Sequence, residues 1–315
     1  MTGTVNKGGG VHHCNIGVKN MEVMKSFYKD LLGFGKVFSE FPEGEYDALG
    51  ELIRVSHPRY EGILFTQEAG GIVLGLTRLV DPVPRAVRNN FRYGDIGIAK
   101  ITIAVSDLER FYRERMGRLD FCSGPKRAAI ADRGDYHFVY CRDPEGNLVE
   151  FVATAETPVK NTFGGVRRLG VSVTDLNRSL SFYQKYLGFD TTFINTHENF
   201  SGLVDEISSS KGTRVRSCVL ASSRGEGMVE LFEVMQPRGR SIPSYTRWGD
   251  FGYTQVCLNG EPGSDIFDIA EYFEKEGMEF LCRPQLMGDA RGGGFFYMRD
   301  PDGIPLEFLV FNRPA

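Results

Sequence analysis

The sequence predicts an α+β fold built from four copies of one unit, which consists of a strand, a helix and three further strands. A repeated hairpin supports this prediction, as does a repeated segment in which a strand leads directly into a helix, called the strand-to-helix entry. The first hairpin, Gly292 to Phe311, reads GGGFFYMRDPDGIPLEFLVF, and the second, His137 to Val152, reads HFVYCRDPEGNLVEFV. In both, apolar runs that favour strands flank a turn of Pro and Gly. Because the two copies keep a Tyr, the turn and a Glu in step, they indicate duplication of a structural unit.

The strand-to-helix entry of residues 11–34 recurs at residues 167–189, at a constant offset of 155 residues. Asn20 and Asp175 occupy the position where a short polar side chain caps the helix. Two further entries follow Lys100 and Tyr253. The units therefore span about residues 11–78, 94–154, 165–236 and 250–311, in an N-terminal half of residues 8–158 and a C-terminal half of residues 164–315.

Composition narrows the class of protein. The chain has 315 residues, 41% hydrophobic and 25% charged, with a net charge of −4, which is typical of a globular protein with no large basic surface for nucleic acid. No apolar run reaches the roughly 20 residues that span a bilayer, and the polar N-terminus does not resemble a secretory signal. The six cysteines show no CxxC spacing, so we expect reduced thiols and a cytoplasmic protein.

The motifs SFYxxxLGF and RDPxGxxxEF together resemble the vicinal oxygen chelate superfamily. This superfamily includes glyoxalase I, extradiol ring-cleaving dioxygenases, epimerases and bleomycin-resistance proteins, and the resemblance covers nearly the whole chain. It implies four βαβββ modules paired into two cup-shaped β-barrels, with a divalent metal inside a cup. In such proteins the first strand of each module offers one ligand position and the last strand another, usually Glu.

By this resemblance eight residues occupy ligand positions. The first-strand positions are His13, Lys100, Arg168 and Gln255, and the last-strand positions are Gly75, Glu150, Glu230 and Glu307. If modules pair in sequence, each cup contains a cation, which has no lone pair for a metal. If the first pairs with the fourth and the second with the third, one cup gathers His13, Gln255 and Glu307 as a metal site, and the other a charge-balanced cluster. We favour the second pairing.

The sequence VHHCNI resembles the entry of chlorohydroquinone-type dioxygenases, which implies His13 as a ligand and His12 as an acid or base beside it. Tyr297 matches the superfamily's tyrosine that hydrogen-bonds a metal-bound oxygen. Arg291 is a candidate for binding an anionic substrate group. Gln255 departs from the two histidines and one carboxylate of extradiol enzymes, whereas glyoxalase I does use a Gln at such a position. Glyoxalase I also uses a further carboxylate as ligand and base, however, and this chain has Gly75 at that position.

The leading hypothesis is an extradiol-type dioxygenase acting on a catechol- or hydroquinone-like compound, with Fe(II) or Mn(II) favoured and Zn or Ni as alternatives. A glyoxalase-like lyase or isomerase that uses a metal-stabilised enediolate, and a non-catalytic protein that binds an aromatic ligand, stay open. The expected partner is a small oxygenated molecule, with no nucleic acid or membrane. Assembly into a homo-oligomer is left open.

Overall fold

The computed structural model describes residues 8–88, 90–130, 134–153, 162–196, 200–288 and 292–311, which form four successive units of strand, helix and strands. The first contains β1 (Val11–Gly17), α1 (Met21–Lys25), the π-helical η1 (Ser26–Leu31), β2 (Lys36–Glu45), η2 (Asp47–Leu49), α2 (Gly50–Ile53), β3 (Arg59–Gln67) and β4 (Gly70–Asp81). The second contains β5 (Gly97–Val105), α3 (Leu108–Arg115), β6 (Asp120–Phe121), β7 (Lys126–Ile130), β8 (Gly134–Arg142) and β9 (Leu148–Ala153). The third contains β10 (Phe163–Ser172), α4 (Leu176–Tyr186), β11 (Thr191–Thr196), α5 (Asp205–Ser208), β12 (Arg214–Ser222) and β13 (Gly225–Gln236). The fourth contains β14 (Gly252–Asn259), α6 (Ile266–Lys275), β15 (Phe280–Leu286), β16 (Gly294–Arg299) and β17 (Pro305–Val310).

The first strands of the modules decide how the modules pair. Strand β1 runs antiparallel to β14, with Asn15 opposite Gln255, and β5 runs antiparallel to β10, with Lys100 opposite Gly170. The predicted pairing of the first module with the fourth, and of the second with the third, is therefore confirmed. Each first strand also lies parallel to the last strand of its own module.

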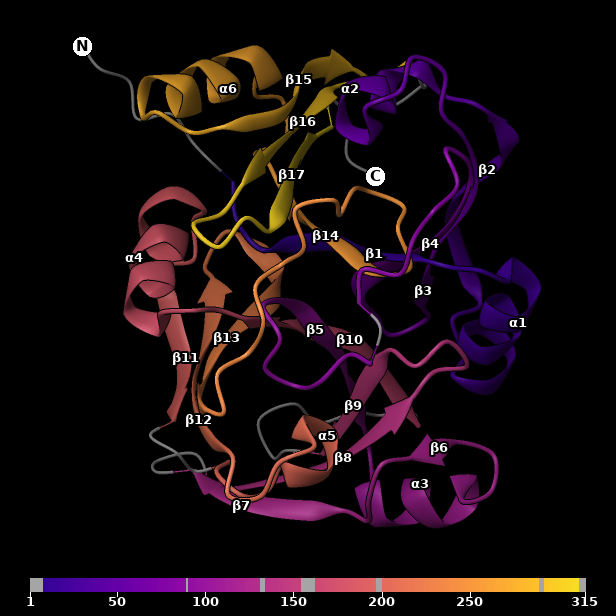
Figure 1. The fold of residues 1–315 in the computed structure, drawn as a ribbon, viewed down its shortest axis with the longest axis vertical. Helices are drawn as coiled ribbons and strands as arrows, with labels where there is room; N and C mark the ends of the chain where they lie inside the picture. Colours follow the sequence, from indigo (N-terminus) through magenta and orange to yellow (C-terminus); the bar gives the residue numbers. More distant parts are fainter. Residues whose placement is uncertain are drawn as a thin grey trace.

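These pairings give two sheets, which Figure 1 shows in the upper and lower parts of the molecule. The sheet of the first and fourth modules is called the outer sheet here, because these modules are the outermost in the sequence. It has the order β2-β3-β4-β1-β14-β17-β16-β15. The sheet of the second and third modules, called the inner sheet, has the order β11-β12-β13-β10-β5-β9-β8, and both β6 and β7 pair with β8. The expected α+β fold of four modules that pair into two curved sheets is confirmed, and within the described residues neither strand order returns to its first strand. Val166 of β10 pairs with Ile72 of β4 and joins the two sheets.

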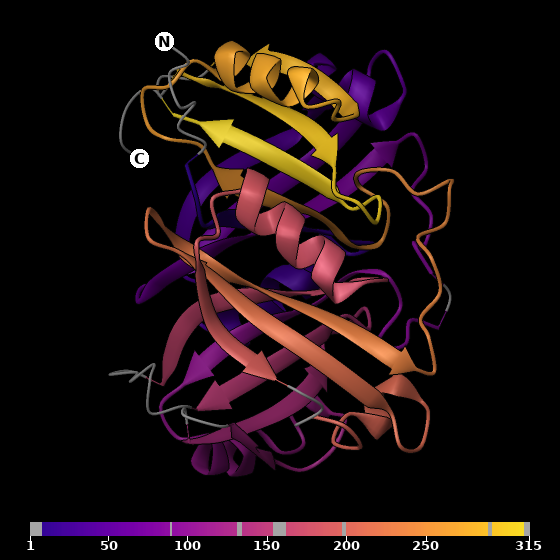
Figure 2. The ribbon, with the colours of Figure 1, turned by 90° about the vertical axis from the view of Figure 1, so that its left-hand side faces the viewer.

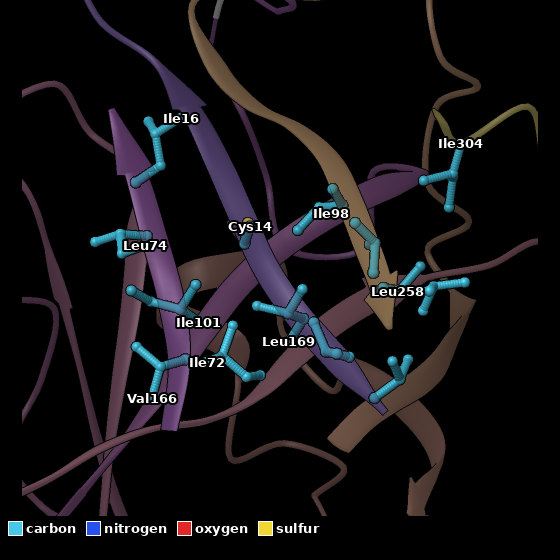
Figure 3. Packing of buried hydrophobic residues seen from close by; sticks show 14 of the residues in the cluster. Cys14, Ile16, Ile72, Leu74, Ile98, Ile101, Val166, Leu169, Leu258 and Ile304 are labelled. Atoms are coloured by element: carbon cyan, nitrogen blue, oxygen red, sulfur yellow. The ribbon is translucent and has the colours of Figure 1, made fainter. Parts of the chain in front are cut away.

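The main core lies where the two sheets meet. Side chains alternate along a strand, so Cys14 and Ile16 of β1 point into this core while His13 and Asn15 point to the opposite face. Figure 3 shows the apolar side chains that meet there. They include Ile72, Leu74, Leu258, Ile98, Ile101, Val166 and Leu169. In Figure 2 the helices α4 and α6 lie on the outside of the strands. Among the described residues, no helix is long and apolar enough to cross a bilayer.

Two buried hydrogen bonds explain why the SFY and RDP motifs occur together. The Tyr28 hydroxyl donates to Asp143 Oδ2 at 3.0 Å, and the Tyr183 hydroxyl donates to Asp300 Oδ2 at 3.2 Å. The other oxygen of each aspartate accepts backbone N–H groups of its own turn. A tyrosine of one module therefore fixes the hairpin turn of the next module within each half. The expected boundary at residues 158–164 lies largely outside the described residues, and the division into halves stays a prediction.

The turn of the fourth module gives a prediction on stability. Burial raises the pKa of Asp300 from 3.8 to about 7, and the neighbouring Asp302 adds to the effect. Because the folded-state pKa is raised, this group stabilises the fold below about pH 4 and its contribution is lost as the pH rises toward 7. Through this group, the unaltered protein should lose on the order of 4 kcal/mol of unfolding free energy between pH 4 and pH 8. We expect Asp300→Asn, which keeps the acceptor for the turn, not to show this loss. Urea unfolding at both pH values measures this; equal pH slopes in the two proteins would contradict it.

Candidate functional site

A cavity of about 440 Å³ lies on the face of the outer sheet that points away from the main core. Its residues come from both the first and the fourth module, including β1, β2, β3, β14, β16 and β17. Eight aromatic side chains line it: Phe38, Phe41, Tyr46, Tyr60, Trp248, Phe295, Tyr297 and Phe311. Among these, Tyr46 stacks on Tyr60 with 4.4 Å between the ring centroids. Such a lining suits a small molecule with an apolar ring.

Three of the predicted site residues meet in this cavity. The Nε2 atom of His13 lies 3.2 Å from Glu307 Oε2. The Nε2 atom of Gln255 lies 3.0 Å from His13 Nε2 and donates to Glu307 Oε2 at 2.7 Å. All three side chains are buried, so the carboxylate of Glu307 has the polar partners that its position in an apolar strand requires. The pairing of β1 with β14 and of β14 with β17 brings these distant residues together.

The orientation of the Gln255 amide follows from a residue that the sequence did not single out. The indole Nε1 of Trp248 donates to Gln255 Oε1. An indole N–H only donates, so the amide oxygen must face Trp248 and the NH2 group must face His13 and Glu307. Trp248 lies in the irregular segment before β14, where no repeat or motif marks it.

His12 lies beside His13, as the sequence predicts. Their Nδ1 atoms are 2.9 Å apart, and the His12 ring packs edge-on against Phe38. His12, His13 and Cys257 form a group of side chains whose ligand atoms lie within 4.8 Å of one another. Cys257 pairs with His13 across β1 and β14, and only knowledge of that register would have revealed it. Burial raises the pKa of the Cys257 thiol, with a further contribution from Glu307.

Tyr297 faces the same cavity and lies directly opposite Glu307 in the pairing of β16 with β17. Burial, followed by the Glu307 carboxylate, raises the pKa of the Tyr297 hydroxyl well above 10. Burial likewise raises the pKa of Tyr60. Both phenols therefore stay protonated near neutral pH and can donate a hydrogen bond. The role of Tyr297 toward a substrate stays a prediction, and Arg291 lies outside the described residues.

The space beside Gly75 is closed to a further ligand. A Cβ at Gly75 would come within 2.5 Å of Asn15 Oδ1. Asn15 is held there by Thr77, to whose hydroxyl its amide donates at 2.9 Å and from which it accepts at 3.1 Å. In place of a carboxylate, the first module thus has a buried Asn–Thr pair whose side chains hydrogen-bond each other.

A divalent metal can be tested against this donor set. Two atoms bound to one ion at about 2.1 Å lie roughly 3 Å apart, and the distance of 3.2 Å between His13 Nε2 and Glu307 Oε2 agrees with this. His13 and Glu307 therefore fit an ion. Gln255, predicted as the third ligand, presents hydrogens rather than a lone pair. Its carbonyl oxygen could take that place only by giving up the hydrogen bond from Trp248.

The corresponding position in the inner sheet contains four charged side chains. Lys100 Nζ lies 3.0 Å from Glu150 Oε1 and 3.0 Å from Glu230 Oε2. Arg168 lies 3.2 Å from Glu150 and 3.1 Å from Glu230. All four are buried, and the two positive and two negative charges balance. This is the predicted cluster, and neither cation offers a lone pair to a metal.

Comparisons with known proteins agree with this architecture. The family model described as the Glyoxalase/Bleomycin resistance protein/Dioxygenase superfamily matches residues 10–151 and 165–308. Glyoxalase I from Zea mays is a similar solved structure, at 15% identity and a TM-score of 0.63, over 96% of this chain and 92% of that chain. A putative dioxygenase from Bacillus subtilis is similar at 15% identity and a TM-score of 0.62, over 98% of this chain and 87% of that chain. At such identities the likeness concerns the fold.

A search of curated proteins found no significant match. The family model nevertheless covers most of the sequence and matches it in two successive segments, one in each half. With the module order and the sheet pairing described above, this shows that the chain belongs to the Glyoxalase/Bleomycin resistance protein/Dioxygenase superfamily.

Proposed function

We propose that this protein is a metal-dependent enzyme that binds a small aromatic compound through two adjacent oxygens, and that it acts as an extradiol-type ring-cleaving dioxygenase. The observation that supports the proposal is the meeting of His13, Gln255 and Glu307, with His12 beside them, in a cavity lined by aromatic rings. His13 and Glu307 would hold the ion. As Fe(II) or Mn(II), it would supply Lewis acidity and reactivity with O2.

The surrounding side chains have separate tasks in this proposal. The aromatic walls bind the ring of a catechol- or hydroquinone-like substrate and exclude water. The Tyr297 hydroxyl donates a hydrogen bond to a substrate oxygen. His12 accepts or delivers a proton at the substrate, since imidazole is the side chain suited to proton transfer near neutral pH. Each task requires the residue to face the cavity, as all three kinds of residue do.

Oxygen consumption is the measurement that tests this proposal. Protein prepared without chelator and loaded anaerobically with Fe(II) should consume O2 in step with loss of substrate on a panel of catechols and hydroquinones. The same preparation treated with EDTA should consume none. Turnover that proceeds without O2 would contradict the dioxygenase and favour the lyase or isomerase with Zn, Ni or Mn.

A second candidate is a non-catalytic protein that binds an aromatic ligand in the same cavity. The hydrogen bonds from the Gln255 amide favour it, because they give both His13 and Glu307 a polar partner within the protein. Elemental analysis separates the two candidates. A stoichiometric transition metal supports the enzyme, whereas its absence, with a thermal stability that EDTA leaves unchanged, supports the binding protein.

A further inference from the structure

Trp248 and Gln255 form a buried donor and acceptor pair at the edge of the candidate metal site. The exposed fraction of Trp248 is 6% and that of Gln255 is 2%. The indole nitrogen of Trp248 carries one hydrogen and has no lone pair available as an acceptor. Only the oxygen of the Gln255 amide can therefore face it, and Gln255 Oε1 does so.

Several contacts fix Trp248 in this position. The Tyr60 ring packs against the indole at 5.2 Å with an angle of 70° between the ring planes. On either side of Trp248, the backbone N–H of Arg247 donates to Asp250 Oδ2 at 3.0 Å, and the N–H of Asp250 donates to the Arg247 carbonyl at 3.3 Å. Asp250 Oδ1 in turn accepts the backbone N–H of Arg85. Both the segment and the ring are held, so the indole N–H has a defined direction.

The opposite side of the amide is fixed as a consequence. Gln255 Nε2 has two hydrogens, which meet Glu307 Oε2 at 2.7 Å and His13 Nε2 at 3.0 Å. Rotation of the amide by half a turn would set its NH2 group against the indole N–H and leave two buried donors facing each other. Such an arrangement is strongly unfavourable. The rotated amide is also the form in which Gln255 could bind an ion.

We propose that Trp248 is a positioning residue that keeps the NH2 group of Gln255 directed at the ion site. Gln255 is then a hydrogen-bond donor to an oxygen of the bound substrate, and not a ligand of the ion. This inference rests on the proposed function and deepens it. If His13 Nε2 binds the ion, its lone pair is no longer free to accept the N–H of Gln255. That N–H then needs a new acceptor. A substrate with two adjacent oxygens offers one in its phenolate or carbonyl oxygen.

The first test uses the fact that the chain contains one tryptophan, so its indole N–H gives a single resonance in a proton–nitrogen correlation spectrum. Gln255→Leu, which removes the acceptor, should move this resonance to the position of an indole without a hydrogen bond. Glu307→Gln, which leaves the acceptor in place, should move it far less. An unchanged indole resonance in Gln255→Leu overturns the inference, whatever the metal content of the protein.

The second test measures binding of Mn(II) alone and of catechol to the Mn(II)-loaded protein by calorimetry. Trp248→Phe frees the amide to rotate, so its affinity for Mn(II) should rise and its affinity for catechol should fall, each by roughly tenfold. Tyr245→Phe, an aromatic change at a half-exposed site in the same segment, should change neither affinity. Equal Mn(II) affinity in Trp248→Phe and the unaltered protein overturns the inference. Absence of Mn(II) binding in all proteins overturns the proposed function, while the shifted indole resonance still supports the fixed amide.

Discussion

Lys100→Met is expected to lower the free energy of unfolding by roughly 3 to 5 kcal/mol, because it leaves two buried carboxylates with one buried cation. Lys100 is 1% exposed and its ammonium group lies 3.0 Å from both Glu150 and Glu230. It also faces the rings of Tyr93 and Tyr140 at 5.9 and 5.3 Å from their centroids. Methionine fills a similar volume, so the loss reports mainly on the charge. Urea unfolding at pH 8 measures it.

The pH dependence of this loss has a defined sign. Burial raises the pKa of Glu150, and Lys100 opposes that rise. Removal of Lys100 therefore raises the folded-state pKa of Glu150 further above its value in the unfolded chain. A group with a raised folded-state pKa stabilises the fold at low pH, and this contribution is lost as the pH rises. The loss should be smaller at pH 5 than at pH 8.

Two further variants serve as controls for Lys100→Met. Glu230→Gln in the same chain should recover part of the stability, since one buried cation and one buried carboxylate then remain. Lys185→Met removes an exposed lysine that lies 3.4 Å from Glu276 and should leave the free energy of unfolding nearly unchanged, because solvent screens exposed ion pairs. Losses of equal size at positions 100 and 185 would show that the inner cluster does not depend on charge balance.

His13→Ala is expected to lower the affinity for the metal at least about 100-fold, because loss of a ligand costs at least as much as loss of a residue that orients one. It should also abolish O2 consumption. Metal content after dialysis and calorimetric titration with Mn(II) provide the measurement. His137→Ala, a partly buried histidine on β8 of the inner sheet, is the matched control and should keep the metal. Full metal content in His13→Ala would show that the ligand assignment is wrong.

The pairing of modules could be predicted because it follows from local chemistry. Grouping Lys100 and Arg168 with Glu150 and Glu230 leaves no cation at the other site, which favoured this pairing over the sequential one, and the ion pairs of the inner sheet agree. Tyr297 was expected at the site from its match to the family's tyrosine, because hairpin spacing alone does not show which face a side chain takes; in the structure it pairs with Glu307 and lines the cavity. Repetition and the alternation of side chains along strands carry this part of the information.

The remaining features depend on contacts between distant segments. The direction of the Gln255 amide is set by Trp248, which lies in an irregular segment that is not repeated elsewhere in the chain. Cys257 joins the site through the register of β1 on β14, which shifts near Val11. The wall of the cavity from Phe38 to Leu49 belongs to β2 and to η2 after it, where no motif indicates which side chains point inward.

The nesting of the strand pairs has a consequence for synthesis on the ribosome. The strands of the inner sheet end at residue 236, so that sheet can form, with its ionic cluster, while the fourth module is still being made. Strand β1, with His13, has its antiparallel partner only when β14 emerges, and Glu307 of β17 emerges later still. Contacts over such sequence separations form slowly. The cavity with His13 and Glu307 can therefore assemble only after the strands of the two middle modules have emerged, beside a sheet that they have already formed.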